Sequence, residues 1–147
     1  MKNFNKELLE DFIRKEWDNR WTNYPLARQT TQFYSHQSKL KAKKLLKNSR
    51  GRVSKFVNIV TGHNDLAYHT SLADPENFSD GCTYCNIDRE TFFHWTTDCP
   101  AFWLSQRKIF LDKVPDADME WNIEDLFRFS EIPAVERLLY QNLTDYE

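Results

Sequence analysis

The chain is poor in glycine, with three in 147 residues: Gly51, Gly62 and Gly81. This scarcity disfavours a turn-rich β fold and any glycine-rich phosphate-binding loop. No apolar run of 18 residues occurs, so we expect no transmembrane helix. The first residues are charged and amphipathic and do not resemble a secretory signal, so we expect an intracellular protein, nuclear or cytoplasmic.

Acidic residues are missing from a long stretch of the chain. None lies between Asp18 and Asp65, where ten basic residues occur. Residues 1–60 carry 14 Lys and Arg against 5 Asp and Glu, whereas residues 61–147 carry 6 against 17. Unbalanced positive charge in one segment is what contact with a polyanion requires. The alternative is that the acidic half neutralises the basic half inside one fold.

Cysteine is absent outside one stretch, which reads Cys82-x2-Cys85-x8-His94-x4-Cys99. Cys82 and Cys85 share one tight turn, and the five-residue step from His94 to Cys99 returns to the same side of a short helix. Four such ligands fill a tetrahedral zinc shell and leave no open position. The spacing therefore predicts one structural Zn²⁺ ion; the alternative is three unliganded thiols in a reducing compartment.

Hydrophobic periodicity predicts an all-α protein of six or seven short helices, with a single domain over residues 1–147. Within it we distinguish a basic helical lobe, 1–60, from an acidic lobe, 61–147, that carries the zinc knuckle at 82–99. The main helices are expected over 3–20, 38–50, 52–61, 88–98, 121–129 and 133–141.

Some positions within these helices are assigned more closely. Apolar residues are expected to form an inner face at Leu8, Leu9, Phe12, Ile13 and Trp17 in the first helix, and at Leu40, Leu45 and Leu46 in the second. Gly51 and Gly62 are expected to end the second and third helices as C-cap glycines. Asp88 is expected to begin the helix that carries His94, with Glu90 in its first turn.

Several short motifs accompany the four predicted ligands. Thr61-Gly62-His63 is followed by His69, Glu90-Thr91 precedes His94, and Pro100-Ala101 follows Cys99, with Arg107 beyond. Upstream stand Trp17-x3-Trp21, Arg28-x-Thr30-x2-Phe33 and a Lys-rich helix that ends at Ser49-Arg50. Over about residues 11–111 this combination resembles the C-terminal tail of reverse transcriptase polyproteins from non-LTR (LINE, jockey-like) retrotransposons, which follows their RNase H domain.

The resemblance implies a non-catalytic tail, because polymerase motifs are absent and no RNase H domain precedes the matching part. We expect either a fragment or a domesticated stand-alone protein. It further implies that Cys82, Cys85, His94 and Cys99 hold zinc and that the tail helps to hold nucleic acid. His63 and His69 fall in a shared motif; we interpret them first as core histidines and next as second-shell partners of the zinc site.

The first functional hypothesis is a module that binds RNA or single-stranded DNA. Its expected contacts are the basic residues Lys39, Lys41, Lys43, Lys44, Lys47, Arg50, Arg52 and Lys55. Aromatic residues near the knuckle could stack on unpaired bases, although core packing is the commoner fate of Phe. These aromatics are Tyr84, Phe92, Phe93 and Trp95.

Two other hypotheses compete with this one. A protein-interaction or assembly subunit would use the acidic half, with Trp121, Phe127 and Phe129 at its contact surface; the alternative is that these aromatics are buried in the core. A hydrolase built on His63 and His69, with Asp65 or Asp74, is disfavoured because a catalytic zinc needs an open position. We therefore expect no enzyme activity.

Overall fold

The structure is a computed structural model that describes residues 2–25, 29–110 and 121–139. Over these ranges it contains nine α-helices, one short 3-10 helix and no β-strand, which confirms the all-α prediction. None of the helices in the described ranges is both long enough and apolar enough to cross a membrane. In chain order the elements are α1 (Lys2–Asn23), α2 (Thr30–Phe33), α3 (Lys39–Leu45), α4 (Arg50–Thr61), α5 (Ala67–Ala73), α6 (Phe92–Thr97), η1 (Pro100–Phe102), α7 (Trp103–Phe110), α8 (Ile123–Ser130) and α9 (Pro133–Leu139).

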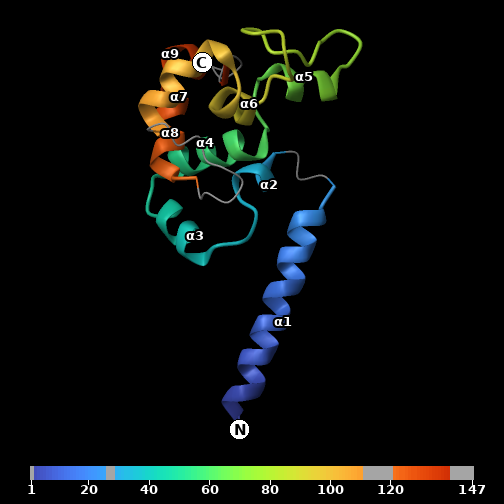
Figure 1. The fold of residues 1–147 in the computed structure, drawn as a ribbon, viewed down its shortest axis with the longest axis vertical. Helices are drawn as coiled ribbons and strands as arrows, with labels where there is room; N and C mark the ends of the chain where they lie inside the picture. Colours follow the sequence, from blue (N-terminus) through green and yellow to red (C-terminus); the bar gives the residue numbers. More distant parts are fainter. Residues whose placement is uncertain (1, 26–28, 111–120, 140–147) are drawn as a thin grey trace.

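The first helix extends away from the other helices as a rod, with its C-terminal end nearest to them (Figure 1). Trp21 fastens this end, because its indole Nε1 donates a hydrogen bond of 2.7 Å to the backbone oxygen of Tyr34. The apolar stripe that we expected to face inward is exposed, at 54% for Leu8 and 65% for Phe12. That prediction was wrong because residues 37–39, which line a pocket together with Ile13 and Trp17, leave the apolar side chains of α1 largely uncovered.

The core is aromatic and joins the two halves of the sequence. Helix α4 packs against α2, α6 and α8, and α7 packs against α8. The rings of Phe92 and Phe129 meet edge to face, with centroids 5.7 Å apart. Helix α4 belongs to the basic half and α6 and α8 to the acidic half, so the hydrophobic contacts cross the charge boundary.

The aromatic contact surface that we predicted in the acidic half is part of this core. Trp121, Phe127 and Phe129 are 4%, 2% and 0% exposed. Trp121 packs edge to face on Phe33 and on Phe110, which closes off the face it would present to a partner. The prediction was wrong because α8 turns its apolar side inward onto α4 and α7.

The Lys-rich helix is shorter than predicted and its end differs. Helix α3 stops at Leu45 rather than at residue 50, and the side-chain amide of Asn48 bonds the carbonyls of Lys44 and Leu45. The hydroxyl of Ser49 then caps α4, so Gly51 lies in the first turn of α4 and is not a C-cap. Leu40 and Leu46, expected on an inner face, are exposed, whereas Leu45 is half-buried.

Other predicted ends agree with the structure. Gly62 terminates α4 in the left-handed conformation, with φ of 79°, as expected of a C-cap glycine. The predicted helix 133–141 is observed as α9, which ends at Leu139; residues 140–141 lie outside the described ranges.

Candidate metal centre

Cys82 and Cys85 lie on a tight hairpin that precedes α6. Gly81 and Arg89 form an isolated antiparallel bridge, and the amide of Cys82 donates to the carbonyl of Asp88 at 2.8 Å. The turn itself is closed by the amide of Asn86, which donates to the carbonyl of Cys82 at 2.9 Å. Asn86 has φ of 55°, a conformation that Asn tolerates better than most side chains. The hairpin thus points both thiols to one side.

His94 and Cys99 come from α6 and the residues that follow it. Thr91 caps this helix, its Oγ1 accepting from the amide of His94 at 3.0 Å. Past the helix, the amide of Cys99 donates to the carbonyl of His94 at 2.9 Å, which folds the chain back so that both side chains share one side. The expected helix 88–98 is therefore observed as α6, Phe92–Thr97, because residues 88–90 belong to the hairpin and cannot be helical.

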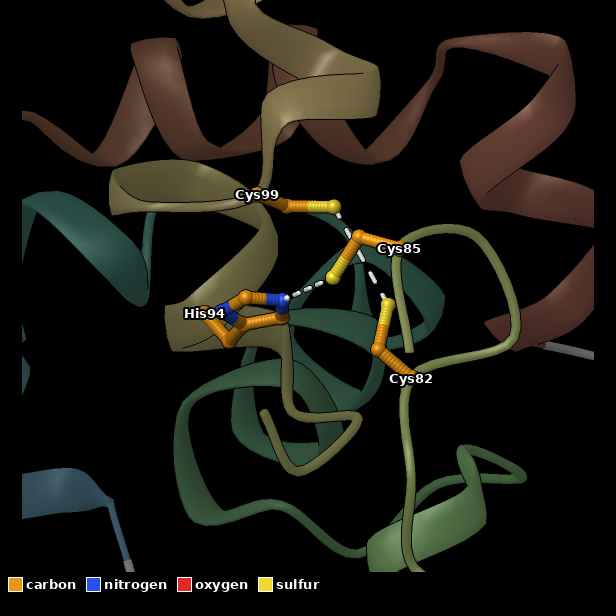
Figure 2. Close-up of side chains that lie close together, drawn as sticks. All are labelled: Cys82, Cys85, His94 and Cys99. Atoms are coloured by element: carbon orange, nitrogen blue, oxygen red, sulfur yellow. Dashed lines mark hydrogen bonds between the residues drawn. The ribbon is translucent and has the colours of Figure 1, made fainter. Parts of the chain in front are cut away.

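The four side chains converge on one point (Figure 2). Their ligand atoms all lie within 4.8 Å of one another. The Sγ atoms of Cys82 and Cys99 are 3.9 Å apart, and Cys85 Sγ lies 3.3 Å from His94 Nε2. Cys82, His94 and Cys99 are buried and Cys85 is half-buried. This cluster can hold a metal ion, with three sulfur ligands and one imidazole nitrogen.

The thiols of the cluster differ in acidity. Burial by itself raises the pKa of Cys85, but hydrogen bonds from the Ile87 amide and from His94 outweigh it and lower the pKa to about 7. Burial raises the pKa of Cys99 to about 12. Because a metal binds thiolates, an ion at this site must displace the Cys99 proton, whereas Cys85 loses its own proton readily.

Two buried side chains brace the cluster from outside. Trp95 is fully buried, and its Nε1 lies 3.4 Å from the sulfur of Cys82, to which it donates. Gln106 of α7 is also buried, and its amide nitrogen donates to the carbonyls of Trp95 and Cys99 at 2.8 and 3.1 Å. These two hydrogen bonds hold α7 against the backbone at Trp95 and at Cys99.

Glu90 supports the turn between Cys82 and Cys85, and the prediction that it lies in the first turn of a helix was wrong. Its carboxylate is 3% exposed and accepts hydrogen bonds from the amides of Ala67 and Thr83, at 2.9 and 2.6 Å, and from the Thr83 hydroxyl. It therefore joins the start of α5 to the turn between the first two cysteines. The Glu-Thr motif before His94 marked the residue, but the assumed helix 88–98 hid its role.

The predicted nucleic-acid residues separate into two groups. Arg52 pairs with Glu124 at 2.9 Å and lies over the ring of Phe127, and Lys55 approaches Glu136 at 3.8 Å. Among the described residues no ion pair involves the remaining exposed cations of the segment, which are Lys39, Lys43, Lys44, Lys47 and Arg50. Lys41 is half-buried, with its Nζ 4.7 Å from the ring centroid of Tyr34.

His63 and His69 lie beside one another, with ring centroids 5.2 Å apart. The Nδ1 of His63 is 3.2 Å from the Thr61 hydroxyl. His69 lines a polar cavity of about 240 Å³ whose wall also includes His94, Gln29 and Arg89. His63 is exposed, so its interpretation as a core histidine was wrong, and neither histidine belongs to the group of four side chains that could hold a metal.

The aromatic residues of the knuckle are mostly unavailable for stacking on bases. Phe92 and Trp95 are 0% exposed, so the alternative of core packing applies to these two and they do not stack on a nucleic acid. Phe93 packs edge to face on Phe33 with centroids 5.1 Å apart. Tyr84 is 42% exposed and donates its hydroxyl to the carbonyl of Ala134.

Comparison of the chain with family models, with curated proteins and with solved structures finds no match.

Proposed function

We propose that this chain is a non-catalytic module, stapled by one structural zinc ion, that binds RNA or single-stranded DNA through the basic helix α3. We further propose its descent from a retrotransposon reverse transcriptase tail, on the motifs around the four ligands. The observation that carries the binding proposal is the set of exposed cations on α3 and at the start of α4.

The ligand geometry supports zinc as the ion. With Zn–S bonds of about 2.3 Å, a tetrahedral shell has S–S edges of about 3.8 Å and S–N edges of about 3.5 Å. The Cys82–Cys99 and Cys85–His94 separations, 3.9 and 3.3 Å, are close to these edges. Three thiolates and an imidazole favour zinc over the hard cations Mg²⁺ and Ca²⁺. Metal analysis of the purified protein should show one zinc per chain, and a folded protein without zinc would contradict this.

The charge distribution supports a polyanionic partner. Arg52 and Lys55 are engaged by Glu124 and Glu136, so part of the basic segment does neutralise the acidic half. Lys39, Lys43 and Lys44 of α3 form no ion pair in the part of the chain that the structure describes, although Lys39 lines one pocket with Glu7 and Glu10 of α1. These three side chains are exposed on one short helix, and phosphates binding there would release condensed counterions.

The test compares two triple variants with the parent. Changing Lys43, Lys44 and Lys47 to Gln removes three exposed charges from the segment. For single strands each lost phosphate contact should flatten the slope of log affinity against log salt by about 0.7, hence by about 2 in total. The matched control changes Lys6, Lys15 and Lys108 to Gln and should keep the parent slope. Equal slopes for both variants, or no parent binding at low salt, would remove the proposal.

A second function is favoured by α1. Its exposed apolar residues, Leu8, Leu9, Phe12, Ile13 and Trp17, are the kind of surface that a protein partner covers. In this alternative the chain is an assembly subunit and the zinc site is purely structural. The test is sedimentation of the protein in the presence of co-purified components. A monomeric profile that the double variant Leu8→Lys/Phe12→Lys leaves unchanged would argue against the assembly subunit.

A further inference from the structure

An apolar groove lies directly beside the basic helix. It is formed by α3 and α4, with the end of α1 and the residue after α2 closing it, and its volume is about 450 Å³. We call it the α3–α4 groove. Its floor is apolar and aromatic, and its lining includes Trp21, Tyr34, Leu45, Phe56, Val57 and Val60.

The rim of the α3–α4 groove is positively charged. Lys39 and Lys41 line it, and Lys41 holds its ammonium 4.7 Å from the Tyr34 ring centroid. A ligand whose anionic group takes this ammonium is thereby brought to the aromatic part of the groove. The apolar floor fits flat aromatic groups, and the cationic rim fits anionic groups. Together they match a ligand that carries aromatic groups on an anionic chain.

We propose that the α3–α4 groove binds an unpaired nucleobase of single-stranded nucleic acid, while the flanking phosphates contact the lysines of α3. The inference rests on the proposed function and deepens it, because it explains how a lysine helix can prefer a single strand. In a duplex the bases are stacked inside and only the phosphates are offered, whereas unpaired bases stack on aromatic side chains. The lysines then position the backbone, and the groove selects strands with accessible bases.

A peptide with apolar side chains is the competing occupant. It would fit the apolar floor, whereas a single strand offers flat bases to the floor and phosphates to the lysines of α3. The chain itself supplies a probe for this alternative, since α1 exposes Leu8, Phe12 and Trp17. A synthetic peptide of residues 4–21 can therefore be tested against the same groove.

The main experiment blocks the groove without touching the charges. Ala42 is exposed on α3 and lines the groove, so Ala42→Phe should fill it. The control, Ala73→Phe, adds the same ring at an exposed position outside the groove. Affinities are measured by anisotropy for three labelled probes of about 12 nucleotides, within the usual site size. These are oligo-dT, an abasic strand of equal charge and a duplex.

The expected result is a loss confined to strands with unpaired bases. The parent should bind oligo-dT about tenfold more tightly than the abasic strand, which is the scale of one stacked base. Ala42→Phe should remove this difference and leave the abasic and duplex affinities within about twofold of the parent. Ala73→Phe should behave as the parent.

Fluorescence gives an independent reading of where the base sits. Trp21 lines the groove, whereas Trp103 is 51% exposed on α7 and does not. Binding of oligo-dT should quench tryptophan emission, and Trp21→Phe should lose most of this quenching while Trp103→Phe keeps it. Quenching that survives in Trp21→Phe would place the base elsewhere and overturn the assignment.

Failure of this inference differs from failure of the proposed function. If oligo-dT, the abasic strand and the duplex bind equally and Ala42→Phe changes none of them, the groove is not a base site, although the lysines still bind nucleic acid. If none of the probes binds the parent at low salt, the proposed function fails and the inference with it. Tighter binding of the residue 4–21 peptide than of oligo-dT, lost in Ala42→Phe, would assign the groove to a protein segment and overturn it.

Discussion

The buried carboxylate of Glu90 shows what a single side chain does in this protein. It accepts two backbone amides from segments that are distant in sequence, at Ala67 and Thr83. Without it, two part-buried amide donors would be left without their acceptor, which costs free energy. The residue therefore stabilises the turn between Cys82 and Cys85 without being one of the four side chains that could hold a metal.

Glu90→Gln is expected to destabilise the protein by about 1–3 kcal/mol. The glutamine side chain has an NH2 group in place of one carboxylate oxygen, and this donor would face the backbone amide donor of Ala67 or Thr83. The free energy of unfolding, from urea denaturation, measures this. The exposed Glu76 provides the control, since Glu76→Gln should change stability by less than about 0.5 kcal/mol. Equal stability of the two variants would mean that Glu90 does not brace the turn.

Cys85→Ser is expected to abolish stable metal binding, because three ligands remain and the hydroxyl of Ser is a poor substitute for a thiolate. Metal content by elemental analysis and the melting temperature should both fall. Ile87→Ser changes an exposed residue of the same turn, 75% exposed, and should keep the metal. A Cys85→Ser protein with full metal content would exclude Cys85 as a ligand.

At the scale of the element, α4 carries two glycines with opposite roles. Gly51 lies in its first turn, and an added Cβ would meet nothing within 4 Å. Gly62 ends the helix at φ of 79°, and an added Cβ would lie 3.3 Å from Nε2 of Gln29. That nitrogen is already bound to the carbonyl of Ile59, so Gln29 cannot easily move aside.

Gly51→Ala should therefore stabilise the protein by about 0.5–1 kcal/mol, because Ala loses less backbone entropy in a helix. Gly62→Ala should destabilise it by about 1–2 kcal/mol, the cost of a left-handed conformation for a residue with a Cβ. Urea denaturation of both variants measures the difference. If the free energy of unfolding changed with the same sign in both variants, the positions assigned to the two glycines would be contradicted.

At the scale of the whole molecule, the metal cluster lies where hairpin, α6 and α7 meet. Trp95 links it to the aromatic core through its indole, which donates to the sulfur of Cys82, and through a ring contact with Phe102. Phe102 in turn packs on Phe129 of α8. Loss of the ion should therefore loosen the core as well as the hairpin.

Removal of metal with a chelator is expected to lower the melting temperature and to reduce the near-ultraviolet circular dichroism of the buried tryptophans. Metal binding contributes to folding free energy when the unfolded chain has no preformed site. Addition of one equivalent of Zn²⁺ should restore both signals. A chelated protein, shown by analysis to be free of metal, that melts like the parent would mean that the ion does not staple the fold.

The sequence by itself determined the features that depend on nearby residues. The group of four side chains that could hold a metal was predictable because Cys82 and Cys85 share one turn, and because His94 and Cys99 lie at one helix end. The left-handed cap at Gly62 was predictable for the same reason, since few other residues adopt that conformation. The all-α class followed from helical periodicity sustained over most of the chain.

Only the tertiary structure decided which faces are buried and which charges are paired. The apolar stripe of α1 and the aromatic residues of α8 have similar patterns, yet the first is exposed and the second is buried. Arg52 meets Glu124 across 72 residues of sequence, and Glu90 reaches Ala67 across 23. Such outcomes depend on how helices pack against one another, because a pattern defines a helix face but does not specify what covers it.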